Sequence, residues 1–145
     1  MAFPVGGSGY QIGDGNESSP LFYIQPAPVT FTVDPAPTAA QLAGVALFLG
    51  TPAGGIAFTL PTVAALEAGF QSMGEKVNTA FEFVIINTAA QNITVTTNTG
   101  WTVTGSGSMV VNNTSGRFLA RKTGAGTWQV YRRRWSYLHP ADRPA

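Results

Sequence analysis

Cysteine is absent from this chain of 145 residues, and histidine occurs only once, as His139. The lack of cysteine excludes disulfide bonds, thiol chemistry and cysteine-ligated zinc. A single histidine leaves one candidate for the side chain that most often acts as a general base near neutral pH. The Asp and Glu residues are scattered, and Asp14–Glu17 lacks the ligand spacing of a calcium loop, so it also fits a solvated turn. We therefore expect no metal, no cofactor and no catalytic residues, and predict that the chain is not an enzyme.

Charged residues are also scarce, since Asp, Glu, Lys and Arg make up 10% of the sequence, against about 25% in typical soluble domains. The net charge of +1 provides no broad basic field for nucleic acid. With 44% apolar residues, so little charge favours a surface partly hidden in an oligomer or larger assembly. A neutral monomer coated with threonine would have the same composition.

Long hydrophobic runs are missing as well. No run approaches the roughly 18 apolar residues that span a bilayer. The first residues, MAFPVGGSGYQIGDGNE, have neither the basic nor the apolar region of a signal peptide. We expect no membrane partner and synthesis in a cytoplasm without secretion.

What the chain does contain is a series of short segments rich in threonine, β-branched and aromatic residues, separated by Gly and Asn turns. Their spacing of about 8–12 residues is typical of all-β domains. The sequence predicts a mainly β fold, an antiparallel β-sandwich or jelly-roll-like domain with one or two short helices and an extended N-terminal arm. The predicted strands are 45–50, 55–60, 80–87, 93–96, 101–103, 109–111, 117–122 and 128–132.

The clearest predicted strand is Ala80 to Asn87. Its alternation places Phe81, Phe83 and Ile85 on one face, and Glu82, Val84 and Ile86 on the other. The second half of the strand is apolar on both faces, as in a strand lying between two layers.

The chain divides into three predicted parts: an arm (1–36), a β domain (37–134) and a tail (135–145). Within the arm, Pro26 and Pro28 interrupt an apolar stretch. Because proline lacks the backbone donor of a sheet ladder, this stretch is an edge strand or an extended arm. Packing on its own domain and packing on another subunit both remain open.

Two short helices are expected after Pro37 and Pro61. In each, a threonine (Thr38 or Thr62) acts as N-cap and a glycine (Gly44 or Gly69) ends the helix. Helices this short need tertiary packing, which we assign to the leucines Leu42 and Leu66.

Several segments give the chain a resemblance to a recurring tailed-phage virion protein. They are Thr38–Leu42, Phe58–Leu66, Phe81–Thr88, Asn92–Val95, Gly100–Gly105 and Gly116–Phe118. In outline the chain resembles phage capsid decoration (cement) and head-fibre-like proteins, which are small, β-rich and usually trimeric. The resemblance covers residues 37 to 134, and the tail departs from it.

This resemblance implies a structural virion protein on the capsid surface, made in the host cytoplasm. It would bind the major capsid protein as a homotrimer and stabilise the shell. The expected capsid contacts are Leu21, Phe22, Tyr23, Ile24, Phe31, Arg132, Arg133, Arg134, Trp135 and Tyr137. The expected trimer core is Phe81, Phe83, Ile85, Trp101 and Val103.

Two of these assignments have alternatives. The run of three arginines that begins at Arg132 is either a contact patch or the solvated end of a last strand. A receptor- or glycan-binding tip of a tail fibre would use exposed Trp101, Trp128 or Trp135 to stack on sugars, whereas buried tryptophans belong to a core.

Overall fold

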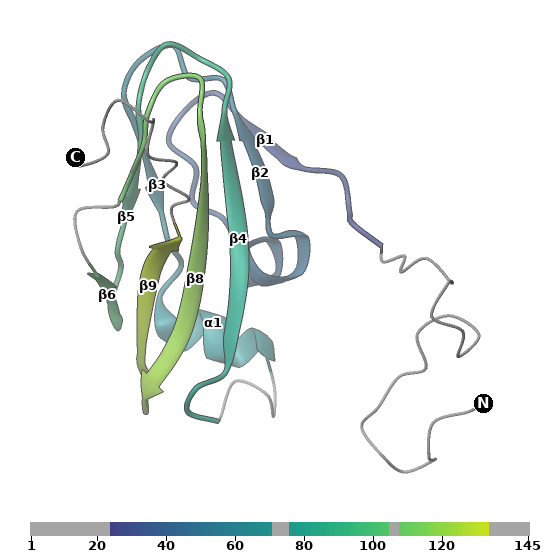
Figure 1. The fold of residues 1–145 in the computed structure, drawn as a ribbon. Helices are drawn as coiled ribbons and strands as arrows, with labels where there is room; N and C mark the ends of the chain where they lie inside the picture. The colour runs from purple at the N-terminus through teal and green to yellow at the C-terminus, as the bar shows by residue number, and fades with distance from the viewer. Residues whose placement is uncertain (1–23, 71–75, 105–107, 134–145) are drawn as a thin grey trace, which may run out of the picture.

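The structure, a computed structural model, describes residues 24–70, 76–104 and 108–133. Within these ranges the chain forms nine strands and two short helices (Figure 1). In chain order they are β1 (Val29–Phe31), η1 (Gln41–Val45), β2 (Leu47–Gly50), β3 (Ile56–Thr59), α1 (Val63–Phe70), β4 (Ala80–Asn87), β5 (Ile93–Thr96), β6 (Trp101–Thr104), β7 (Met109–Val110), β8 (Ser115–Gly124) and β9 (Thr127–Arg133).

The strands form two sheets, which confirms the prediction of a mainly β fold. The larger sheet has the order β1-β2-β4-β8-β9-β6, and the smaller has the order β3-β5-β7. The sheets are mixed and not antiparallel throughout: β4–β8, β5–β7 and β8–β9 are antiparallel, whereas β1–β2, β2–β4, β3–β5 and β6–β9 are parallel. The sequence suggested hairpins since consecutive strands are usually neighbours. Here the turn after β2 instead carries the chain from the larger sheet into the smaller one.

Stacked turns explain the parallel pairs. Strands β2 and β4 are each followed by a short turn into the smaller sheet, as β3 and β5. These two turns lie against each other: the Thr88 N–H donates to the Gly50 carbonyl at 2.9 Å, and the Thr51 and Thr88 hydroxyls lie 2.8 Å apart. At the far end of β3 and β5, the Thr59 and Thr96 hydroxyls lie 3.0 Å apart. Similar segments therefore stack in the same direction, and their threonines bond across the stack.

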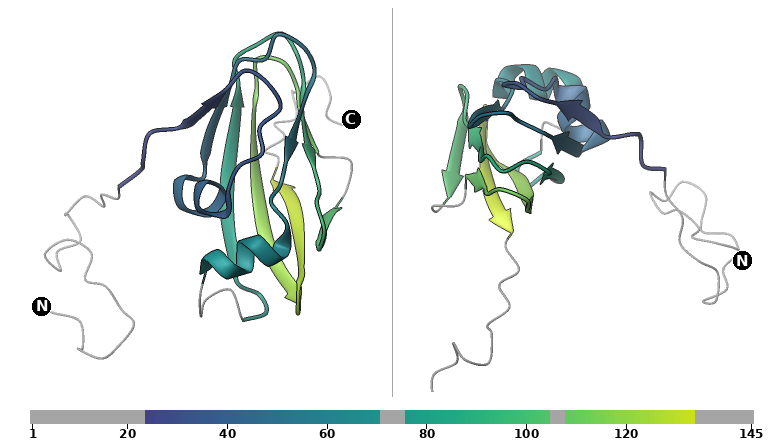
Figure 2. Two further views of the ribbon diagram at one scale, coloured as in Figure 1. Left: turned by 180° about the vertical axis from the view of Figure 1, so that it is seen from behind. Right: turned by 90° about the horizontal axis from the view of Figure 1, so that it is seen from above.

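The larger sheet has two distinct faces. Along β4, Phe83, Ile85 and Asn87 are buried, whereas Val84 and Ile86 between them are partly exposed. This confirms the predicted alternation. Figure 1 looks onto the outer face, with α1 and the smaller sheet behind it; Figure 2 (left) shows the same elements from behind. The inner face is therefore covered by α1 and the smaller sheet.

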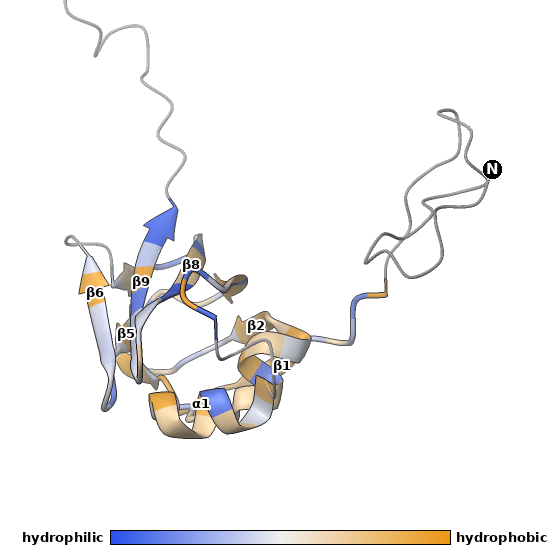
Figure 3. Cartoon of the chain, turned by 90° about the horizontal axis from the view of Figure 1, so that it is seen from below, coloured by the Kyte–Doolittle hydropathy of each residue, from blue (hydrophilic) through white to orange (hydrophobic). Residues whose placement is uncertain are grey.

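Strand β1 lies at one edge of the larger sheet, next to β2 alone. This confirms the edge position predicted from Pro26 and Pro28. The sheet thus already begins at Val29, within the segment assigned to the arm. Residues 24–28, which precede β1, are exposed and lead away from the body (Figure 3).

The predicted threonines precede both helical segments: residues 39–40 form a helical turn that leads into η1, and α1 begins at Val63. The Thr38 hydroxyl accepts the Gln41 N–H at 3.2 Å, and the Thr62 hydroxyl accepts the Ala65 N–H at 3.2 Å. The Gln41 side chain in turn accepts the Thr38 N–H at 3.0 Å, which completes a reciprocal cap. The N-cap predictions are therefore confirmed.

The helices pack as predicted but end differently. Leu42 and Leu66 are fully buried. Gly44 lies inside η1, because this turn is π-helical and Ala46 takes the left-handed conformation (φ 57°) that ends it. Gly69 lies inside α1. The two glycine stops were wrong because the sequence gives no sign of the wider turn or of the helix continuing to Phe70.

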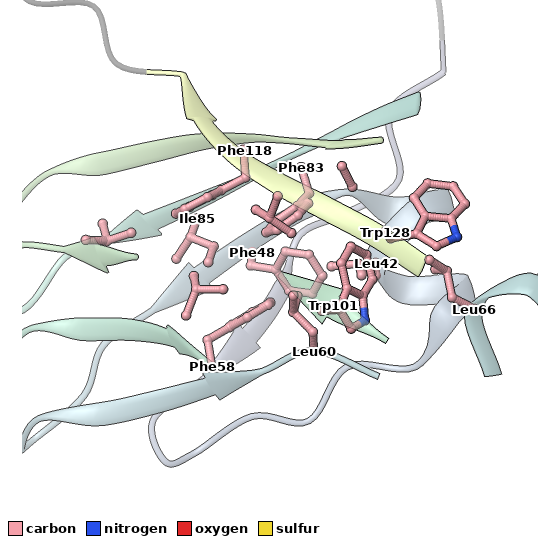
Figure 4. Packing of buried hydrophobic residues seen from close by; sticks show 14 of the residues in the cluster. Leu42, Phe48, Phe58, Leu60, Leu66, Phe83, Ile85, Trp101, Phe118 and Trp128 are labelled. Carbon is pink, nitrogen blue, oxygen red and sulfur yellow. The ribbon is translucent and has the colours of Figure 1, made fainter. Parts of the chain in front are cut away.

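Side chains of both sheets and both helices share one hydrophobic core (Figure 4). The ring of Phe58 on β3 contacts those of Phe48 on β2 and Phe83 on β4, with centroid separations of 4.9 and 6.2 Å. Phe83 also stacks on Phe118 of β8 at 5.1 Å. Each such pair contributes about 0.5–1.5 kcal/mol beyond the area that it buries. These aromatic contacts fasten the smaller sheet to the inner face of the larger one.

Candidate interaction surfaces

The five residues expected to form a trimer core lie in the core of the single chain. Phe83 and Ile85 are fully buried, and Trp101 is 6% exposed. Phe81 and Val103 are partly buried and pack against the same cluster. Phe83, Ile85 and Trp101 are therefore enclosed within one chain and are not available to form a trimer core. Phe81 and Val103 are only partly buried, and their place in a trimer core stays a prediction.

Two of the three tryptophans are also internal. The indole N–H of Trp101 donates to the Pro61 carbonyl at 2.7 Å, and that of Trp128 donates to Glu67 Oε1 at 3.1 Å. Trp128 is fully buried. Neither ring presents a face on which a sugar could stack, and Trp135 lies outside the described residues.

The predicted arm contacts have different positions. Ile24 is 94% exposed, while the neighbouring Gln25 donates its side-chain amide to the Val45 carbonyl at 2.7 Å. Phe31 packs on the core instead, with its ring 5.9 Å from that of Phe58. Phe31 is partly buried and anchors β1 on the core; its role as a capsid contact stays a prediction. The remaining predicted contacts of the arm, Leu21, Phe22 and Tyr23, lie outside the described residues.

The arginines at the end of β9 point in different directions. Arg132 donates to the Met109 carbonyl of β7, and Arg133 forms an ion pair with Glu82 of β4. Figure 3 shows the hydrophilic end of this strand. Arg132 thus bonds to the smaller sheet, and Arg133 bonds across β8 to β4, so these two arginines do not form one patch. Arg134, Trp135 and Tyr137 lie outside the described residues, as do His139 and Asp14–Glu17.

An aliphatic patch on the outer face of the larger sheet was not identified from the sequence. It lies mainly on β2 and β4, where Leu47 pairs with Val84, and Leu49 with Ile86. Its members are partly exposed and do not belong to the core cluster. The patch comprises Leu47, Leu49, Val84, Ile86 and Leu119.

No described element lies over this patch (Figures 1 and 2). The apolar pattern on both faces of Ala80–Asn87 was the signal that could have located it. The second covering layer expected from that pattern is absent among the described residues, where only the inner face of β4 is covered.

Arginines border the patch on the side of β8 and β9. Arg117 is exposed and lies opposite Val84 in the β4–β8 ladder. Arg121 donates to Asn78 and to the Tyr131 hydroxyl, and its guanidinium lies 5.7 Å from the centre of the Tyr131 ring. The outer face thus combines aliphatic side chains on two strands with positive charge on the next two.

A nearly buried ion pair fastens α1 to the inner face. Lys122 Nζ lies 2.6 Å from Glu67 Oε1, with side-chain exposures of 6% and 26%. The hydrogen bond from Lys122 holds the pKa of Glu67 below its usual value of 4.5, although desolvation acts in the opposite direction. The hydrogen bond from Trp128 lowers the pKa further. No local sequence pattern predicts this pair, because its members are 55 residues apart on a helix and a strand that only the fold brings together.

Two further observations concern only the described ranges. They contain no group of three or more His, Cys, Asp or Glu side chains placed to hold a metal ion. They also contain no helix with the length and apolarity needed to cross a membrane.

Comparison of the chain with protein-family models, with curated proteins and with solved structures gave no match.

Proposed function

We propose that this protein is a structural virion protein, a capsid decoration protein that binds as a homotrimer to the major capsid protein of an assembled phage shell. The observation that carries the proposal is the exposed stretch of residues 24–28, which extends away from the β domain. The large aromatic side chains of that domain pack in its own core. Ile24 in this stretch is 94% exposed. An apolar side chain held outside a closed body is suited to contact with another chain.

The physical basis of such a role is multivalency. Three copies related by symmetry present the same contact three times, and linked contacts raise avidity by about 10²–10⁴ when the geometry allows all of them to form. Each contact can then be weak. A protein that binds only the assembled lattice stabilises that lattice by mass action.

The stacked β core supports this role in a second way. Aromatic contacts between the sheets, the threonine pairs across the turns and the ion pair at α1 all lie within one chain. A body fixed in this way loses little conformational freedom when it binds, which lowers the entropic cost of association.

The test is co-sedimentation with shells assembled from the major capsid protein encoded in the same genome. We expect the full chain to bind expanded shells and to raise their melting temperature, and we expect no binding to unassembled capsid protein. A chain that leaves expanded shells unbound at micromolar concentration would refute the proposal.

A further inference from the structure

The aliphatic patch is a group of partly exposed apolar side chains that no described element covers. Its five members sit side by side on three neighbouring strands, in ladders that fix which residues face outward. A sheet face that contacts only water normally carries polar side chains. This face instead carries Leu47, Leu49, Val84 and Ile86. A partner that covers them removes this apolar surface from water.

The charge distribution of the sequence indicates which partner. Residues 1–24 contain two acidic residues, Asp14 and Glu17, and no Lys or Arg. The outer face carries Arg117, Arg121 and Arg133, with Glu82 as the only acidic residue among the described residues of that face. The N-terminal segment is therefore complementary to the outer face in charge.

The same segment also supplies apolar side chains. Leu21, Phe22, Tyr23 and Ile24 follow one another in the sequence. They come after Asp14 and Glu17, so the segment offers negative charge and then apolar groups. The outer face offers arginines on β8 and β9 and then aliphatic groups on β4 and β2. The order of the two properties matches.

The direction of the chain distinguishes a neighbour from the same molecule. Gln25 is held at Val45, two residues before the patch member Leu47. Residues 24–28 lead away from the body (Figures 1 and 3), and Ile24 is 94% exposed. Twenty-three residues precede Ile24 and can span at most about 76–83 Å, at 3.3–3.6 Å per residue. This reach is sufficient to meet a second copy.

We propose that the aliphatic patch binds the N-terminal segment, residues 1–24, of a second copy of this chain. The contact is heterologous, with the segment on one copy and the patch on the next. Such a contact forms a closed ring when the rotation between copies completes a circle. The inference rests on the proposed function only for the number of copies, which the trimer sets at three.

The first test measures the mass of the full chain in solution, without capsids, by analytical ultracentrifugation. We expect a trimer for the full chain and a monomer when residues 1–24 are deleted. The deletion ends before β1, so the described sheets are retained. A deleted chain with the mass of the full chain would overturn the inference, as would a full chain that stays monomeric.

Charge reversal provides a test that leaves the core untouched. Arg117→Glu should weaken self-association by about tenfold, because it places like charges across the contact. Restoring attraction with Asp14→Lys and Glu17→Lys in the same chain should recover most of the loss. Lys76→Glu makes the same charge change at an exposed position in the approach to β4, outside the outer face, and should have no effect. Equal effects of Arg117→Glu and Lys76→Glu would contradict the inference.

Crosslinking identifies the partner directly, because the natural chain has no cysteine. One variant carries Ile24→Cys and another Leu49→Cys, and a short bismaleimide is added to their mixture. We expect crosslinked dimers between the two variants, and few when Leu49→Cys is replaced by Thr94→Cys on the smaller sheet. Crosslinks that form only within a chain carrying both cysteines would show that the segment covers its own patch, and would overturn the proposal.

These measurements use no shells, so the two proposals can fail separately. A chain that assembles through the patch but does not bind expanded shells would refute the decoration function alone. A chain that binds shells but keeps its mass after deletion of residues 1–24 would refute the patch contact alone.

Discussion

The inner and outer faces of the larger sheet carry similar apolar side chains but differ in what covers them. On the inner face, Phe83 and Ile85 are fully buried under the smaller sheet and α1. On the outer face, Val84 and Ile86 of the same strand remain partly exposed. The comparison shows that strand alternation alone does not decide burial. The inner face is completed within one chain, whereas the outer face is available for another.

The largest expected effect comes from exchanging an aromatic side chain on the inner face. Phe83→Ala should lower the free energy of unfolding by about 3–5 kcal/mol, because it opens a cavity where three aromatic contacts meet. Ile86→Ala on the outer face should cost about 1 kcal/mol or less. Urea unfolding at one fixed protein concentration measures both values. Equal losses would show that the two faces are equally enclosed.

A second comparison uses the ion pairs of the two faces. The inner pair, Lys122–Glu67, is mostly buried, while the outer pair, Arg133–Glu82, has side-chain exposures of 59% and 36%. Glu67→Gln should cost about 2–3 kcal/mol, because Lys122 loses its carboxylate partner in a nearly buried position. Glu82→Gln should cost about 0–1 kcal/mol. Urea unfolding measures both costs, and a larger loss of unfolding free energy for Glu82→Gln than for Glu67→Gln would contradict the difference assigned to the two pairs.

The inner pair also gives a pH dependence with a defined sign. Because the pKa of Glu67 in the folded chain is lowered from 4.5, its contribution to stability is complete above pH 4.5 and is lost as the pH falls through the lowered value. The stability difference between the natural chain and Glu67→Gln should therefore shrink below pH 4.5. Thermal unfolding followed by circular dichroism across this range provides the test. A difference that stays constant down to pH 2 would contradict the assigned pKa direction.

A smaller effect is expected at two glycines with different surroundings. A Cβ at Gly50 would lie 2.7 Å from the Phe31 ring and from the Ile93 side chain, whereas a Cβ at Gly54 has nothing within 4 Å. Gly50→Ala should cost about 1–2 kcal/mol by overpacking the site where β1 is anchored. Gly54→Ala should change stability by about 0.5 kcal/mol or less. Hydrogen exchange at Val29–Phe31 reports whether β1 loosens, and unchanged exchange in Gly50→Ala would contradict the anchoring role of Phe31.

Local features of the fold were predictable from the sequence. Alternation identified the strand at Ala80–Asn87, and threonines followed by alanine-rich segments identified the start of both helices. Pro26 and Pro28 identified an edge. Each of these signals acts over a few residues, so it survives in the sequence without knowledge of the fold.

The pairing of the strands was not predictable in this way. Trp101 pairs with Trp128 in parallel strands, and Leu47 pairs with Val84 across an intervening strand and helix. Such ladders depend on how successive turns stack. The contact between the Thr51 and Thr88 hydroxyls results from this stacking, and no local sequence pattern predicts it. The aliphatic patch was not predicted for the same reason, since apolar residues on both faces of a strand do not indicate which face the rest of the chain will cover.

The most direct test of the central claim, that this closed body is made to be held by neighbouring chains on a virion, is cryo-electron microscopy of mature particles. The account predicts three copies around a symmetry axis of the capsid, with Leu49 and Ile86 of each copy enclosed by a neighbouring chain. Particles that lack the protein, or that carry it as isolated copies with these side chains in solvent, would contradict it.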